Sequence, residues 1–242
     1  MSSFRAERLD DGIEVLRLDR PQARNALGSA QLAELEEALG ALGADAGVGA
    51  LVVSTTDPRA LCAGADVAEV LDDAGGVARM EAFARVYAAF DALEVPTVAV
   101  CVGNVVGAGA EIAAGCDLRV GGDNLRLMWA GARMGAPVGP ARLVPLVGLS
   151  RAKELIFTGR VVGAQEALAI GFLHRTAPAS LAEAAAVELA REVVAHDAGG
   201  LRRLKAMFRE LEAMPERVAH ENARLVDWQR HGAGLRAGGV RG

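Results

Sequence analysis

Twice along this chain an apolar segment of six residues leads into a loop of glycine and alanine and then into a helical pattern. The first unit joins Ala50–Thr55 to a helix predicted over 77–93 through "LCAGADV", and the second follows Thr97–Val102 with "VVGAGAEI". Both strand segments are apolar almost throughout, as strands covered on both faces are. Strands that alternate with helices in this way predict an α/β fold.

The segments around these two units fit the same fold class. Gly12–Asp19 alternates apolar and polar residues as a half-buried strand does, and Ser29 is predicted to cap the helix that follows. After Gly139 the sequence predicts short helices and one edge strand. Each of the two long helices should turn one apolar face inward. The inward residues are Leu32, Leu35, Leu39 and Leu42 in the first helix and Met80, Phe83, Tyr87 and Phe90 in the second.

The C-terminal part of the chain has a helical period almost throughout, from residue 180 to about residue 229. We place a soft boundary near Ala179, which divides the chain into a core, 1–179, and a helical oligomerisation segment, 180–242. Apolar residues between Leu181 and Leu211 exceed what one small body covers, so they should pack on the core or on a neighbouring subunit. The last stretch, 231–242, is expected to have no regular structure.

Composition excludes several classes of function. The 242 residues are 52% hydrophobic and 24% charged, which is typical of a globular protein. A net charge of −5 without a basic cluster argues against nucleic-acid binding. No apolar run approaches the roughly 18 residues of a membrane span. The cysteines lack metal-ligand spacing, so we expect no metal and a cytoplasmic protein with reduced core thiols at Cys62, Cys101 and Cys116.

The two glycine loops put small residues where a strand gives way to a helix. Small residues let a ligand approach the backbone, and the first N–H groups of a helix are unsatisfied and partly positive. Two facing loops would make an oxyanion hole; without a ligand they would be two tight turns. A dinucleotide site is a weaker interpretation, because Ile112 stands where GxGxxG needs a small residue. A serine hydrolase is weaker still, since Ser150 lacks a GxSxG setting.

Four segments resemble, in order and spacing, the enoyl-CoA hydratase/isomerase (crotonase) family: "RPQARNAL", "ALCAGADV", "NVVGAGAEIAAGCDLRV" and "ELIFTGRVVGAQEALAIGFL". The resemblance extends from about Gly12 to Arg224. It implies a crotonase-like spiral of ββα repeats with a C-terminal helical segment, assembled as a homotrimer or hexamer. It also implies an acyl-CoA substrate, in fatty-acid or related metabolism, with no cofactor because coenzyme A is part of the substrate.

The resemblance also assigns roles to single residues. The two amides of the family's oxyanion hole fall on Ala65 and Ala108, and Glu111 falls on the first of two glutamates that hold and activate water. Gly131 stands where the second glutamate is expected, so restoring a glutamate there should raise hydration. The residues expected along the substrate are Arg24, Ala26, Ala63, Gly64, Asp66, Val67, Gly107, Trp129 and Gly131, with Trp129 either a wall of the acyl pocket or plain core.

Glu111 is unusual on its own terms, because it is the one carboxylate among small and apolar residues in "NVVGAGAEIAAG". Either it faces solvent, or it is buried with a raised pKa that suits a general acid/base near neutral pH. With Gly131 as its counterpart, three functions stay open. They are an enoyl-CoA hydratase or isomerase, a non-catalytic or weakly active acyl-CoA-binding protein, and a structural protein that keeps only the fold.

Overall fold

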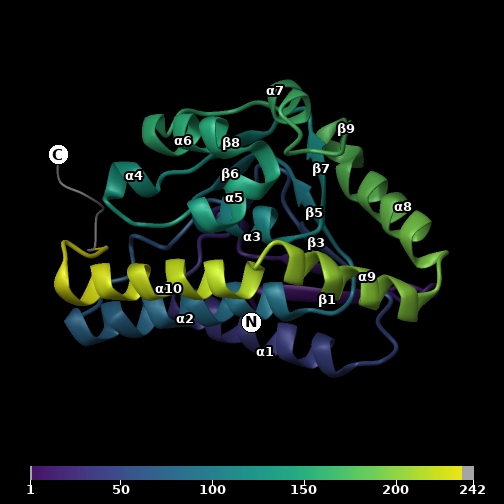
Figure 1. Cartoon of the computed structure of the whole chain (residues 1–242), viewed down its shortest axis with the longest axis horizontal. Coiled ribbons are helices and arrows are strands. Elements are labelled where there is room, and N and C mark those ends of the chain that lie inside the picture. Colours follow the sequence, from purple (N-terminus) through teal and green to yellow (C-terminus); the bar gives the residue numbers. More distant parts are fainter. Residues whose placement is uncertain (1, 236–242) are drawn as a thin grey trace.

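The computed structural model describes residues 2–235, and from the third strand onward its strands alternate between two sheets (Figure 1). The larger sheet has the order β1-β2-β3-β5-β7-β9 and the smaller one the order β4-β6-β8. All neighbours pair in parallel except β1 and β2, which are antiparallel. The strands are β1 Phe4–Arg8, β2 Ile13–Leu18, β3 Ala50–Thr55, β4 Ala60–Cys62, β5 Thr97–Cys101, β6 Asn104–Val106, β7 Leu118–Gly122, β8 Arg126–Met128 and β9 Arg175–Ala177.

Three consecutive units repeat this alternation, each with one strand in each sheet and then a helix: β3-β4-α2, β5-β6-α3 and β7-β8-α4. The predicted ββα spiral is therefore confirmed, and the edge strand expected after Gly139 is β9. The helices are η1 Pro21–Ala23, α1 Ser29–Ala44, α2 Asp73–Ala92, α3 Ala108–Gly115, α4 Gly131–Met134, α5 Pro140–Val147, α6 Leu149–Thr158, α7 Ala164–Ala169, η2 Ala179–Leu181, α8 Ala182–Val194, α9 Ala198–Leu211 and α10 Met214–His231.

The larger sheet is covered on both faces, which explains its continuously apolar strands. In β3, Leu51 and Val53 point into the core that α1, α2 and α3 complete, whereas Ala50 and Val52 point to the face that α8 covers. Full burial of each such Leu or Val stabilises the fold by roughly 1.5–3 kcal/mol. The sheet thus forms a rigid base from which the short β4-β6-β8 sheet and its loops project.

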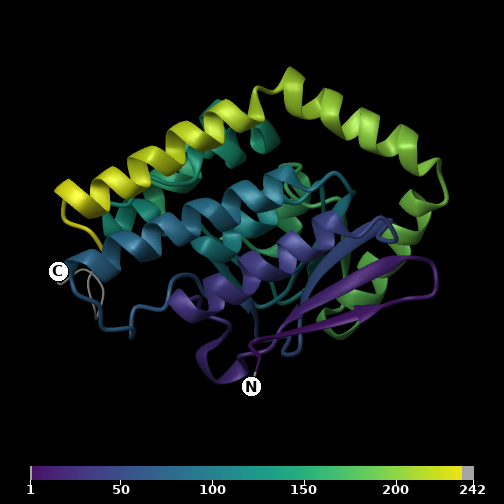
Figure 2. The ribbon, with the colours of Figure 1, turned by 90° about the horizontal axis from the view of Figure 1, so that it is seen from below.

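The C-terminal helices pack back on the same body. Helix α8 lies across β3, β5 and β7, and α10 runs beside α2 in both views of the ribbon (Figures 1 and 2). Helix α9 joins them and contributes no buried residue. Within residues 2–235, no helix combines the length and apolarity that a bilayer crossing needs. Of the stretch expected to lack regular structure, α10 includes His231, and 236–242 lie outside the described residues.

Two helix starts differ from the sequence predictions. Ser29 was expected to be an N-cap, but Gly28 holds that position and Ser29 is the first helical residue, its N–H donating to Glu69 at 3.1 Å. The second helix was expected from residue 77, yet α2 begins at Asp73 because the Asp72 side chain accepts from the N–H of Gly75 at 2.7 Å. This cap compensates for the low helix propensity of two glycines in the first turn. The same glycines are why the sequence pattern does not indicate that the helix begins here.

Candidate active site

The two glycine loops lie against each other at the edge of the small sheet. Gly64 has a φ of +106° and Gly107 a φ of +52°, conformations that side chains rarely adopt. A Cβ atom on Gly64 would lie 3.1 Å from the carbonyl oxygen of Val106 and 3.9 Å from the backbone nitrogen of Ala108. The absence of a side chain at Gly64 lets the loops approach closely, whereas Gly107 is favoured by its backbone conformation.

Within residues 2–235, neither the backbone N–H of Ala65 nor that of Ala108 donates a hydrogen bond to another residue. Leu27 donates to the carbonyl of Gly64 and accepts from the N–H of Asp66, both at 2.9 Å. Because successive peptide groups of an extended strand alternate in direction, the N–H of Ala65 points away from Leu27. Ala108 is the first residue of α3, so its N–H has no partner inside the helix.

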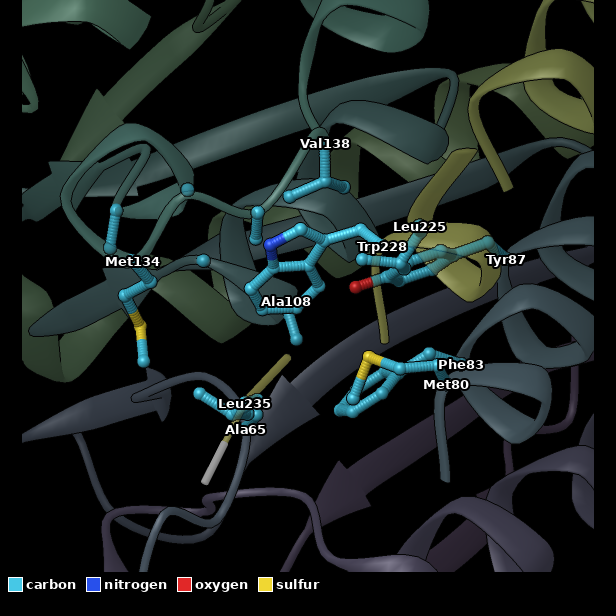
Figure 3. A pocket seen from close by; sticks show the side chains of 14 residues that line it. Ala65, Met80, Phe83, Tyr87, Ala108, Met134, Val138, Leu225, Trp228 and Leu235 are labelled. Carbon is cyan, nitrogen blue, oxygen red and sulfur yellow. The ribbon is translucent and has the colours of Figure 1, made fainter. Parts of the chain in front are cut away.

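A cavity of about 80 Å³ opens beside these two residues (Figure 3). Ala65, Gly107, Ala108 and Gly131 form one side of it. The other sides are apolar side chains, of which α2 supplies Met80, Phe83 and Tyr87, the segment 134–138 supplies Met134 and Val138, and the C-terminal part supplies Leu225, Trp228 and Leu235. A water's share of liquid volume is about 30 Å³, so the volume suits a small apolar group.

Glu111 is buried one helical turn behind Ala108, with 1% of its surface exposed. Its Oε1 accepts from the indole Nε1 of Trp129 at 3.0 Å, and its Oε2 lies 3.4 Å from a guanidinium nitrogen of Arg142. Neither Glu111 nor Trp129 is among the residues that line the cavity. Trp129 packs edge-on against Phe172 instead, with 5.5 Å between ring centres.

Arg142 gathers three buried carboxyl groups, and we call these four residues the Arg142 cluster. Its guanidinium lies 2.9 Å from Asp91, 3.4 Å from Glu111 and 3.7 Å from Glu221, measured between nitrogen and oxygen. Burial raises the pKa of Glu111 to about 8, with the negative charge of Glu221 as the next cause. Burial also raises the pKa of Asp91 and of Glu221. Because the pKa of Glu111 is raised to about 8, its carboxyl group retains a proton at neutral pH.

The other predicted substrate residues form a strip along the loops rather than the cavity wall. The carbonyl of Arg24 accepts from the N–H of Ala63 at 3.0 Å, so the two segments run together. Arg20 joins them further along, since it donates to the carbonyl of Ala26 at 3.1 Å and to Asp66 at 2.6 Å. The strip contains Arg24, Ala26, Ala63, Asp66 and Val67, with Arg24 and Val67 exposed.

Sequence reasoning missed Arg142, Asp91 and Glu221. Arg142 is the one charged residue in the apolar segment "GPARLVPLVG". This position is the sequence feature that could have indicated a buried arginine paired with carboxyl groups. Along the chain, Asp91 lies 51 positions and Glu111 31 positions from Arg142, and Glu221 lies 80 positions from Ala141, the residue next to Arg142. No local spacing could therefore indicate these partners.

The comparisons with known proteins agree with this architecture. The sequence profile of the family described as enoyl-CoA hydratase/isomerase matches residues 8–234. A putative enoyl-CoA hydratase of Thermus thermophilus is 35% identical over 238 residues, covering 93% of this chain and 92% of that protein. A probable mitochondrial enoyl-CoA hydratase 2 of Arabidopsis thaliana is 33% identical over 189 residues; the match covers 76% of this chain but 63% of that protein, less than two thirds of its length.

Solved structures give the same result. The crystal structure of an enoyl-CoA hydratase/isomerase from Xanthobacter autotrophicus Py2 superimposes with a TM-score of 0.85 at 26% identity, covering 97% of this chain and 89% of that one. An enoyl-CoA hydratase from Bacillus anthracis shares the fold with a TM-score of 0.81 at 23% identity, over 98% and 99% of the two chains. With the profile match over nearly its whole length, the chain belongs to the enoyl-CoA hydratase/isomerase family of enzymes.

Proposed function

We propose that this protein binds a short acyl-CoA thioester and acts on it through an enolate, hydrating a 2-enoyl group or shifting its double bond. The N–H groups of Ala65 and Ala108 hold the thioester oxygen, on which negative charge develops. Each donor of this kind is worth roughly 10² to 10³ in rate. No separate cofactor is required, because coenzyme A enters as part of the substrate.

One observation carries this proposal: two backbone N–H groups that have no hydrogen-bond acceptor within residues 2–235, supplied by two glycine loops, border the same apolar cavity. The cavity takes the acyl chain, and the strip from Arg24 to Val67 runs away from it along the surface, where the coenzyme A portion would lie. Two relatives are named as a probable and a putative enoyl-CoA hydratase, which supports the same chemistry.

In this proposal Glu111 is the acid/base. It keeps a proton near neutral pH, since its pKa is raised to about 8, and it lies one turn of α3 behind the hole. Because its carboxyl group is outside the cavity wall, Glu111 must leave Trp129 or Arg142 and turn toward the substrate. Acid/base groups contribute typically 10² to 10⁴ in rate, so a single carboxyl group supports slow hydration or a one-base isomerisation.

A non-catalytic acyl-CoA-binding protein is the second candidate, and the same placement of Glu111 favours it. Gly131 borders the cavity where a second carboxyl group was expected, and the titratable side chain in the cavity wall is the phenol of Tyr87. Such a protein would keep the hole and the cavity and lack turnover.

The proposal includes assembly with further copies of this chain, as a trimer or hexamer. Four apolar residues follow one face of α9 at helical spacing, and each is more than half exposed. They are Leu204, Met207, Phe208 and Leu211. A contiguous apolar stripe of this kind is a typical subunit contact. A cytoplasmic location is also part of the proposal, supported by three buried thiols that form no disulfide within 2–235.

Calorimetry with crotonyl-CoA and butyryl-CoA, together with the loss of 2-enoyl thioester absorbance, tests the function. Binding with turnover supports the enzyme, and binding without turnover supports the second candidate. If neither thioester binds at millimolar concentration, both candidates are wrong, whatever the fold.

A further inference from the structure

Arg79 is a charged residue of α2 that is almost completely buried, with 2% of its surface exposed. Burial of a guanidinium is costly, and apolar side chains of similar volume are often at least as stabilising. Its Nε has no hydrogen-bond partner within residues 2–235, so its hydrogen bonds are made by the two terminal nitrogens. The partners of these two nitrogens therefore indicate what the burial of Arg79 serves.

The guanidinium of Arg79 joins two segments that border the cavity. One terminal nitrogen, Nη1, donates to the carbonyl oxygen of Asp66 at 3.0 Å and lies 3.2 Å from Oε2 of Glu69. The other, Nη2, donates to the carbonyl oxygen of Leu235 at 3.4 Å. Asp66 directly follows Ala65, and both Ala65 and Leu235 line the cavity (Figure 3). Arg79 thus connects the first glycine loop to the C-terminal part of the cavity wall.

The segment 66–72 leads from the first glycine loop to α2 and forms neither helix nor strand. It therefore lacks the ladder of backbone hydrogen bonds that fixes a regular element. The carboxylate of Glu69, which bonds to Arg79, also accepts from the N–H of Ser29, the first residue of α1, at 3.1 Å. Arg79 and Glu69 together fasten this irregular segment between α1 and α2.

The structure assigns Arg79 the role of a positioning residue for the proposed oxyanion hole: it holds the segment after Ala65 so that the N–H of Ala65 stays directed at the thioester oxygen. The N–H of Ala108 needs no such support, because it belongs to the first turn of α3. A displacement of about 1 Å at a positioned group can cost roughly 10²-fold in rate. This inference rests on the proposed function, because it assumes a thioester between the two amides.

The bond from Arg79 to Leu235 is of less consequence for the cavity. Leu235 has a second attachment, since its N–H donates to Oε1 of Gln229 on α10 at 2.7 Å. Loss of the guanidinium should therefore displace the first glycine loop more than the wall around the acyl chain. The inference thus predicts a fall in turnover that is larger than any loss of affinity.

Hydrogen exchange and kinetics of two variants test the inference. Arg79→Met removes every N–H donor, whereas Arg79→Lys keeps a charge beside Glu69 but cannot reproduce the fork that reaches two carbonyl groups. We expect Arg79→Met to accelerate amide exchange in 61–72 at least about tenfold and to leave 105–115 unchanged. Turnover of crotonyl-CoA should fall roughly 10²-fold, while affinity for butyryl-CoA changes less than about threefold. Arg79→Lys should lie between this variant and the natural protein in exchange and turnover.

Arg85→Met is the matched control. Arg85 lies on the same helix, its side chain is 55% exposed, and it pairs with Glu36 on α1. This variant should leave exchange in 61–72, turnover and affinity unchanged.

Three results would overturn the inference while leaving the proposed function intact. The first is natural exchange in 61–72 of both Arg79 variants, and the second is natural turnover in a variant whose exchange there is accelerated. The third is faster exchange along the whole chain with equal losses of turnover and affinity, which indicates a purely structural role. If Arg79→Met does not fold, Arg79→Lys decides by the same measurements. A natural protein that binds neither thioester contradicts the proposed function instead, and exchange in 61–72 then still shows whether Arg79 fastens this segment.

Discussion

Trp129 donates its indole N–H to Oε1 of Glu111 at 3.0 Å and so holds this carboxyl group away from the cavity. The other carboxyl oxygen faces Arg142, which leaves Glu111 with two protein partners and no direct contact with the space a substrate would fill. Acid/base catalysis by Glu111 therefore requires a change of rotamer. In the proposed mechanism, the resting geometry of Glu111 therefore differs from the geometry in which it would act on a substrate.

The raised pKa of Glu111 makes the stability of the fold depend on pH. Between the usual value of 4.5 and about 8, the folded protein holds a proton that the unfolded chain releases. The free energy of unfolding should therefore be highest in acid and fall as pH rises through this window, by at most about 1.4 kcal/mol per pH unit for one proton. Glu111→Gln cannot titrate and should flatten the slope, measured by urea unfolding.

Glu216→Gln is the matched control for this experiment. Glu216 is exposed on α10, the helix that carries Glu221, and it is not a member of the Arg142 cluster. Its variant should keep the slope of the natural protein. A slope that survives Glu111→Gln in full would place the retained proton on Glu221 or Asp91.

Ala108→Pro should remove one donor of the proposed oxyanion hole with little effect on folding. Proline is well tolerated at the first position of a helix, where its missing N–H has no intrahelical partner. We expect the turnover number to fall by roughly 10² to 10³ with an unchanged far-UV spectrum. Ala198→Pro makes the same substitution at the first position of α9 and should leave turnover unchanged. An active Ala108→Pro enzyme would mean that the carbonyl is held elsewhere.

The exposed stripe of α9 predicts the oligomeric state. Natural protein should elute and scatter light as a trimer or hexamer, and Phe208→Glu should shift it toward the monomer because a charge enters an apolar contact. Arg203 lies on the same helix and its side chain is 77% exposed, so Arg203→Glu should leave assembly intact. A natural protein that scatters as a stable 25.0 kDa monomer would contradict this prediction.

Gly131 is tightly enclosed, which changes the expectation drawn from the sequence. A Cβ atom there would lie 2.9 Å from the carbonyl oxygen of Ala136 and 3.2 Å from Val138. Gly131→Glu should therefore destabilise the protein by roughly 1–3 kcal/mol and give no gain in hydration. Gly40→Glu is the matched control, because Gly40 is exposed inside α1 and a Cβ there has nothing within 4 Å, and it should not destabilise the protein. Faster crotonyl-CoA hydration by Gly131→Glu would show that the 131–138 segment moves aside.

The α/β class and most elements could be predicted from the sequence, because strand and helix periods are local properties. The two strands Ala50–Thr55 and Thr97–Cys101 lie almost where their apolar runs placed them. The proximity of the two glycine loops followed from family resemblance and not from spacing. Burial of Glu111 was one of two alternatives in the sequence, and the structure decides between them.

The Arg142 cluster could not be predicted, for a physical reason. Its members come from α2, α3, α5 and α10, and each is an ordinary charged residue within its own segment. Only long-range packing makes them mutual partners. The cavity wall could not be predicted for the same reason, because it combines residues of α2 with residues of α10 that lie more than 100 positions later in the chain.

Helix α10 has a consequence for the order in which this protein becomes functional. It is the last of the described helices to leave the ribosome, and domains begin to fold from the N-terminus while synthesis continues. Until it emerges, the nascent chain carries Arg142 without Glu221, and the cavity lacks Leu225 and Trp228. A growing polypeptide can thus assemble its sheets and present its glycine loops while the cavity wall that Leu225 and Trp228 complete is still missing.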